Sequence, residues 1–151
     1  MNTKRRSITI LITSLLALLA LFPLSVSAQC KGFAKRLCKI ELDPYIHDGN
    51  YHAAILTTGE EAELYKTFYS DTDYRITVCG ADNMPAIEFR VIDSDRNVLY
   101  TNASKDFYGS WDFRLEASQQ LKIFIRVPVN PDMPDEVLSG CVAIMFGFQE
   151  D

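Results

Sequence analysis

Apolar and polar residues alternate along most of this chain, in short runs that begin near position 51. Ile87, Phe89 and Val91, for example, alternate with Glu88 and Arg90. A period of two is typical of strands with one buried face and one face in water. The pattern predicts eight strands, at 51–56, 62–69, 74–79, 86–92, 97–101, 110–115, 120–127 and 141–148.

Residues that favour turns separate these runs, including Thr58-Gly59, the acidic stretch 70–73 and a proline-bearing stretch at 128–134. Eight short strands with one apolar face each predict a mainly β fold, an antiparallel β-sandwich of the jelly-roll type. Trp111 alternates in phase with Phe113 and Leu115, so we expect it to be largely buried between the sheets.

Residues 30–42 have a different pattern and are expected to form a short helix. Phe33, Leu37 and Ile40 recur at spacings of four and three, with basic residues on the other side. The final strand at 141–148 is apolar on both faces over its first part, so its outer side needs a cover. The N-terminal helix is expected to pack there.

The first 28 residues have the layout of a secretory signal peptide. Lys4, Arg5 and Arg6 precede an apolar stretch at 8–24, and small residues follow up to Ala28. Cleavage after Ala28 would leave one domain at 29–151, in the periplasm or outside the cell. No stable membrane insertion is expected after the leader is removed.

All four cysteines, Cys30, Cys38, Cys79 and Cys141, lie after the leader. An even count in an exported chain predicts two disulfides. A continuous helix from Cys30 would separate Cys30 from Cys38 by about 12 Å, so each would pair with Cys79 or Cys141. A helix that begins near Phe33 would instead let Cys30 pair with Cys38, and Cys79 with Cys141.

Charge narrows the classes of partner. The mature chain carries 12 basic and 20 acidic residues, a formal charge of −8. Nucleic acid and anionic lipid are therefore poor partners, whereas a protein or a glycan fits. No motif implies a cofactor or a catalytic nucleophile, and the sequence predicts a protein that is not an enzyme.

Two groups of residues are candidates for binding. His47, Asp48 and His52 lie close together before the first strand and are residues that a metal or acid-base site would use. Their spacing matches no metal-ligand signature, so a polar turn is the simpler interpretation and no metal is assigned. Tyr108 and Phe124 have neighbours that suggest outward placement, as on a surface that recognises a protein or a glycan.

Two further motifs need a structural context. Asp93, Asp95 and Asn97 present oxygens at alternating positions, as in a calcium loop, but a hairpin turn explains them as well. Asn102-Ala103-Ser104 fits the glycosylation sequon, which matters only in a eukaryotic secretory pathway.

The succession of segments 74–78, 89–93, 97–99, 111–113 and 123–127 resembles two groups of jelly-roll modules. These are the bacterial pre-peptidase C-terminal domain and the GOLD-type domain, and the likeness covers about residues 60–148. The chain also resembles an uncharacterised family of exported bacterial proteins. The resemblance implies a non-catalytic module that binds a protein partner or glycan in the cell envelope. The alternative is a metal-binding protein or metal-dependent enzyme centred on His47, Asp48 and His52.

Overall fold

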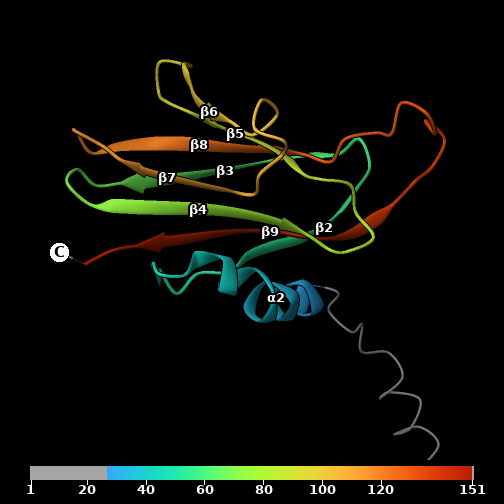
Figure 1. The fold of residues 1–151 in the computed structure, drawn as a ribbon, viewed down its shortest axis with the longest axis horizontal. Helices are drawn as coiled ribbons and strands as arrows, with labels where there is room; N and C mark the ends of the chain where they lie inside the picture. The colour runs from blue at the N-terminus through green and yellow to red at the C-terminus, as the bar shows by residue number, and fades with distance from the viewer. Residues whose placement is uncertain (1–26, 151) are drawn as a thin grey trace, which may run out of the picture.

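The computed structural model describes residues 27–150, which form two antiparallel sheets with one helical segment against them (Figure 1). The predicted leader lies almost wholly outside these residues and stays a prediction. Within 27–150, no helix is long and apolar enough to cross a membrane.

Most successive strands belong to different sheets. Their bounds are β1 (Ile46–His47), β2 (His52–Thr57), β3 (Glu61–Phe68), β4 (Asp73–Gly80), β5 (Glu88–Ile92), β6 (Val98–Thr101), β7 (Ser110–Arg114), β8 (Gln119–Arg126) and β9 (Ser139–Phe148). One sheet has the order β1-β9-β4-β7, with β2 also paired to β9, and the other has the order β3-β8-β5-β6. Among the strands of residues 27–150, only β5 and β6 are consecutive along the chain and paired with each other. The two sheet orders, β2-β9-β4-β7 and β3-β8-β5-β6, confirm the predicted β-sandwich of the jelly-roll type.

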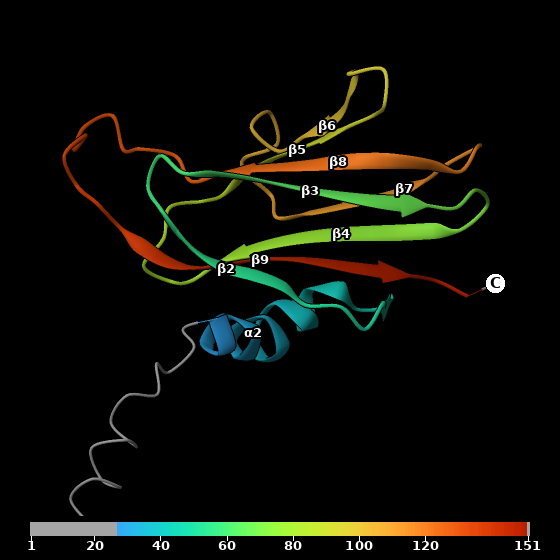
Figure 2. The ribbon, with the colours of Figure 1, turned by 180° about the vertical axis from the view of Figure 1, so that it is seen from behind.

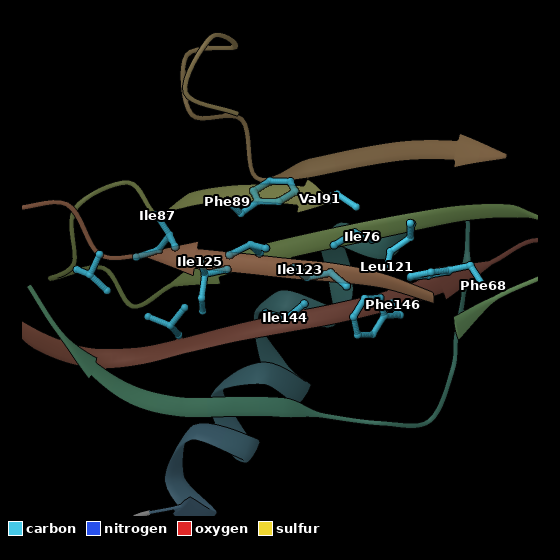
Figure 3. Close-up of a cluster of buried hydrophobic side chains, with 13 residues drawn as sticks. Phe68, Ile76, Ile87, Phe89, Val91, Leu121, Ile123, Ile125, Ile144 and Phe146 are labelled. Atoms are coloured by element: carbon cyan, nitrogen blue, oxygen red, sulfur yellow. The ribbon is translucent and has the colours of Figure 1, made fainter. Parts of the chain in front are cut away.

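The core lies between the sheets and consists of the residues that the alternation placed inward (Figure 3). Phe89 and Val91 of β5 and Leu121 and Ile123 of β8 are fully buried, whereas Glu88 and Arg90 lie on the outer side. Trp111 is on the predicted inner face but is only half-buried. It lies on β7, an edge strand, where the sandwich does not enclose a large ring completely.

The helical segment covers the outer face of β9, as expected (Figure 2). It consists of α2 (Ser27–Arg36) followed by a 3-10 helix, η1 (Cys38–Leu42). Ala34, Cys38 and Leu42 pack against Ala143 and Met145 of β9. Gly147 of β9 also permits the approach, since a Cβ atom there would lie 2.7 Å from Cβ of Tyr45.

The predicted buried side of this segment is wrong in part. Phe33 packs on the cluster as expected, but Leu37 and Ile40 are 55% and 68% exposed. The buried positions are instead Cys30, Ala34, Cys38 and Leu42, spaced four apart. The disulfide between Cys30 and Cys141 fixes which side of α2 faces the sheet. Leu37 and Ile40 lie beyond α2, where the change to a 3-10 helix alters the spacing of side chains that share one side.

Arg75 holds the end of η1 to the sheet. Its guanidinium donates two hydrogen bonds to the carboxylate of Asp112 on β7, at 2.6 and 2.7 Å. It also donates to the carbonyl oxygens of Asp43 and Glu41, at 2.6 and 3.3 Å. One side chain of β4 therefore joins its neighbouring strand to the chain that leaves the helical segment.

Candidate functional site

The structure brings two of the three predicted site residues together, with Nε2 of His47 3.7 Å from Oδ1 of Asp48, but their main contacts are with other neighbours. The ring of His47 lies 4.5 Å from the ring of Tyr51, and its Nε2 is 2.9 Å from the carbonyl oxygen of Asn50. The ring of His52 packs edge-on against Phe146 in the core. Among residues 27–150, no group of three or more histidine, cysteine or acidic side chains is arranged to hold a metal ion.

Asp48 instead forms an ion pair with Lys66 of β3, with Nζ and Oδ2 2.8 Å apart. Burial by itself would raise the pKa of the Asp48 carboxyl. The hydrogen bonds from Lys66 and from the backbone N–H of Asn50 outweigh burial, and the pKa is lowered. Asp48 is therefore a carboxylate held in place by its partners, which is a structural role.

Two hollows lie beside the edge strand β3, on the same side of the sandwich as Asp48. One, of about 160 Å³, is lined mainly by aliphatic side chains of β2, β3, β8 and β9, with His52 at its margin. The other, of about 310 Å³, has Asp48, Lys66 and Thr67 beside the aromatic rings of Tyr69 and Tyr74. Its mixture of rings and polar groups could receive a small polar ligand.

Tyr108 and Phe124 do not belong to one site. Tyr108 is exposed in the connection between β6 and β7. Phe124 lies on the outer face of β8, as predicted, where the guanidinium of Arg90 lies 4.6 Å from its ring centre. Salt bridges surround it on this face, between Lys122 and Glu63 and between Arg126 and Glu88, so the charges there are largely matched.

The acidic turn at 93–97 is a hairpin turn whose oxygens are already used. Oδ1 of Asp93 accepts hydrogen bonds from the backbone N–H groups of Asp95 and Asn97, and Oδ2 accepts one from the Asn97 side chain. These bonds, the Asn97 side-chain bond foremost, lower the pKa of Asp93. The turn's own donors thus occupy the carboxylate that a calcium ion would need.

The most distinctive exposed feature is the long connection between β8 and β9, at residues 127–138 (Figure 1, orange-red, opposite the C-terminal end). Both of its ends are held by the turn between β2 and β3. The N–H of Gly59 donates to the carbonyl of Val127 at 2.8 Å, and the N–H of Thr58 donates to that of Leu138 at 2.9 Å. Oγ1 of Thr58 accepts a further bond from the Leu138 N–H at 3.3 Å.

Between these fixed ends the loop has its own order. Hydrogen bonds close two successive turns, from the N–H of Met133 to the carbonyl of Asn130 and from the N–H of Glu136 to that of Met133, both at 3.1 Å. Pro128, Pro131 and Pro134 each fix one backbone φ angle. These bonds and prolines reduce the conformational entropy that the loop would lose on meeting a partner.

This loop displays apolar side chains among acidic ones. Val129, Met133 and Val137 are 44%, 51% and 73% exposed. The nearby connection between β4 and β5 is held to the start of β9, next to the loop, by a hydrogen bond from the Asn83 side chain to the carbonyl of Ser139, at 2.9 Å. A hollow of about 220 Å³ lies between the two connections, against the β2–β3 turn.

We call the surface formed by residues 58–60, 81–87 and 127–138 the end-loop face. It carries no lysine or arginine. Its five exposed acidic residues are Glu60, Asp82, Asp132, Asp135 and Glu136. The sequence pattern predicted a loop at 128–134 but not its exposed apolar residues. The spacing of three between the prolines was the signal in the sequence for an ordered loop. The hydrogen bonds that hold the loop to the β2–β3 turn join residues far apart along the chain, so no local pattern indicates them.

The glycosylation sequon is not usable in the folded protein. Asn102 is fully buried, its Oδ1 accepts a bond from the N–H of Phe89, and its Nδ2 donates to the carbonyl of Ile87, both at 2.8 Å. The side chain that would carry the glycan instead holds the connection after β6 to the start of β5 by these two hydrogen bonds.

No family model matches the chain, and no curated protein matches it. Among solved structures, the chain is similar to Aeromonas hydrophila PliG, described as a periplasmic lysozyme inhibitor of g-type lysozyme. The two chains are 13% identical, the match covers 66% of this chain and 85% of that chain, and the TM-score is 0.49. A likeness at this level identifies neither a partner nor an activity, and the resemblance to pre-peptidase C-terminal and GOLD-type modules stays a prediction.

Proposed function

We propose that this protein is a non-catalytic, exported binding module that recognises a protein partner through its end-loop face. The observation that carries the proposal is the loop at 127–138, which is fixed at both ends and exposes Val129, Met133 and Val137. Exposed apolar side chains on an ordered loop offer area for contact at a low cost in conformational entropy. The predicted leader and the disulfide agree with export.

The other large surfaces are less suited to this role. The helical segment covers much of the outer face of β9, and salt bridges satisfy many charges on the outer face of β8. The acidic residues of the end-loop face, with no basic residue among them, favour a partner that is positively charged where it docks. Such complementarity accelerates association and excludes acidic competitors.

A double substitution in the loop tests the proposal. Full-length protein would be used to capture partners from an envelope extract of its own cells, beside a Met133→Ser/Val137→Ser variant. The matched control is Val98→Ser, since Val98 is as exposed as Met133 but lies on β6, outside the end-loop face. We expect one protein to be retained by wild type and control, retained at least about tenfold less by the loop variant, and released by salt.

Equal capture of the same protein by the wild type and the loop variant would contradict the proposal. Capture that is insensitive to salt would contradict only the claim that the acidic residues favour a positively charged partner. A triple change, Asp132→Asn/Asp135→Asn/Glu136→Gln, tests that claim separately. It should slow association while the dissociation rate changes less, because exposed charges act chiefly on the rate of encounter.

A glycan ligand is the second candidate, and the hollow beside Asp48 is the observation that favours it. Tyr69, Tyr74 and Phe148 supply ring faces there, and Thr67 and Asp48 supply hydrogen-bonding groups. Sugar rings are recognised by such combinations of stacking and polar contacts. Glycan-array binding that is lost in Tyr69→Ala and kept in Met133→Ser/Val137→Ser would favour this candidate over a protein partner.

A further inference from the structure

Two cysteines meet beneath the helical segment. Cys38, from η1, is fully buried, and Cys79, from β4, is half-buried on the outer face of its sheet. They belong to the same apolar cluster, with Ala143 and Leu42 as neighbours. The two thiols are in hydrogen-bonding contact with each other, which together with burial raises the pKa of the Cys79 thiol.

The existing disulfide spans the same interface. Cys30 of α2 is bonded to Cys141 of β9, with their Cα atoms 5.2 Å apart. Cys79 lies opposite Ala143 in the register of β4 with β9, so it is on the same face as Cys141 and displaced from it by two residues along the sheet. Cys30 and Cys38 are likewise separated along the helical segment. The helical segment and the sheet therefore face each other through two pairs of cysteines, Cys30 with Cys141 and Cys38 with Cys79.

We propose that Cys38 and Cys79 form a second disulfide in the exported protein. This bond would attach η1 to β4 as the first attaches α2 to β9, so that the helical segment is held to the sheet near both of its ends. The sequence leaves three pairings open, and the bond between Cys30 and Cys141 excludes the two that join Cys30 to Cys38 or to Cys79. The inference is independent of the proposed function.

The oxidant is a disulfide, such as oxidised glutathione or the disulfide of a thiol oxidase. The Cys79 thiolate, which belongs to the more exposed of the two residues, attacks one oxidant sulfur and releases the other as a thiolate. The Cys38 thiolate then attacks the sulfur of Cys79 in the mixed disulfide and releases the second oxidant thiolate. Two protein thiols lose two electrons and two protons, and the oxidant becomes two thiols.

Tryptic peptide mapping resolves the pairing, because cleavage after lysine and arginine places the cysteines in different peptides. Cys38 falls in 37–39, Cys79 in 76–90 and Cys141 in 127–151, and cleavage after Lys31 separates Cys30 from all three. Full-length protein is equilibrated with a glutathione redox buffer, denatured, alkylated without reduction and digested. We expect a linked fragment of 37–39 with 76–90, beside the fragment that links Cys30 to 127–151.

The bond between Cys30 and Cys141 is the internal reference. Alkylated Cys38 and Cys79 in a sample where that bond has formed would overturn the proposal, and so would a fragment linking 37–39 to 127–151. Cys38→Ser and Cys79→Ser variants provide a second test. Each should leave the remaining member of the pair open to alkylation after denaturation.

Thermal unfolding adds a measurement on the intact protein. Oxidised wild type should have a Tm higher on the order of 10 °C than oxidised Cys38→Ser/Cys79→Ser, because the second bond restricts the unfolded chain. The difference should largely vanish in reductant. A difference that persists in reductant would mean that the two thiols stabilise the cluster only by packing, and would count against the bond.

Discussion

Lys66 points into the sandwich from an edge strand and ends at Asp48, with its Nζ atom 2.8 Å from Oδ2. Ala62, Leu64 and Phe68 share its side of β3 and pack on the core. The Nζ atom also lies 4.9 Å from the centre of the Phe146 ring. An inward charge at a sheet edge discourages pairing with another chain. Asp48 makes this placement tolerable because it neutralises the ammonium group.

Removal of either partner should therefore have unequal effects on stability. Asp48→Ala leaves a half-buried ammonium group without its anion and should lower the free energy of unfolding by about 1–3 kcal/mol. Lys66→Met should lower the free energy of unfolding by less. The methionine side chain still fills the space beside Phe146, and Asp48 still accepts its hydrogen bond from the N–H of Asn50. Urea unfolding of both single variants and of the double variant measures the coupling, and equal losses in the two single variants would show that the charge plays no part.

His52 should make stability depend on pH. Burial disfavours the imidazolium form and lowers the pKa of His52 from its ordinary value of 6.5, although Asp48 opposes the shift. The unfolded chain therefore binds this proton more tightly, and stability should decline as the pH falls below 6.5 toward the folded-state value. His52→Leu should flatten the Tm profile between about pH 7.5 and pH 5. The same decline in the variant would assign the effect to another group.

Asn102 should be far more important for folding than its sequence context suggests. Asn102→Ala leaves the N–H of Phe89 and the carbonyl of Ile87 without partners inside the protein and should cost about 3 kcal/mol. Ser104→Ala destroys the same sequon at an exposed position and should stay within about 0.5 kcal/mol of wild type. Chemical denaturation of the two variants provides the comparison, and similar values for both would contradict the burial of Asn102.

Trp111 is expected to contribute through ring contacts at the edge of the core. Its ring lies 4.4 Å from that of Phe113 and 5.0 Å from that of Tyr100, both nearly parallel to it. Trp111→Ala should cost about 3 kcal/mol, at the lower end of the range for such changes because the side chain is half-buried. Val98→Ala, at an exposed apolar position, is the control. Unchanged thermal stability of the Trp111 variant would mean that the ring contacts contribute nothing.

The sequence by itself determined eight of the nine described strands, most of their inward faces and the sandwich, and missed the short β1. Each strand's alternation is a local property, because successive side chains of an extended chain point to opposite sides. Ile87, Phe89 and Val91 are therefore inward whatever they meet. The two-sided apolar character of β9 likewise predicted the helical cover, because a buried outer face needs a partner.

Tertiary structure decided what depends on residues distant along the chain. Cys38 and Leu42, not Leu37 and Ile40, are buried in the helical segment. Cys30 is bonded to a residue 111 positions away, which fixes the side of α2 that faces the sheet, and the chain continues from α2 as a 3-10 helix. Asp48 became a structural anion because β3 brings Lys66 beside it. The loop at 127–138 takes its place on the end-loop face because hydrogen bonds join Leu138 to Thr58 of the β2–β3 turn. Local patterns record the environment of a side chain but not its partner, since partners are fixed only when the sheets close on each other.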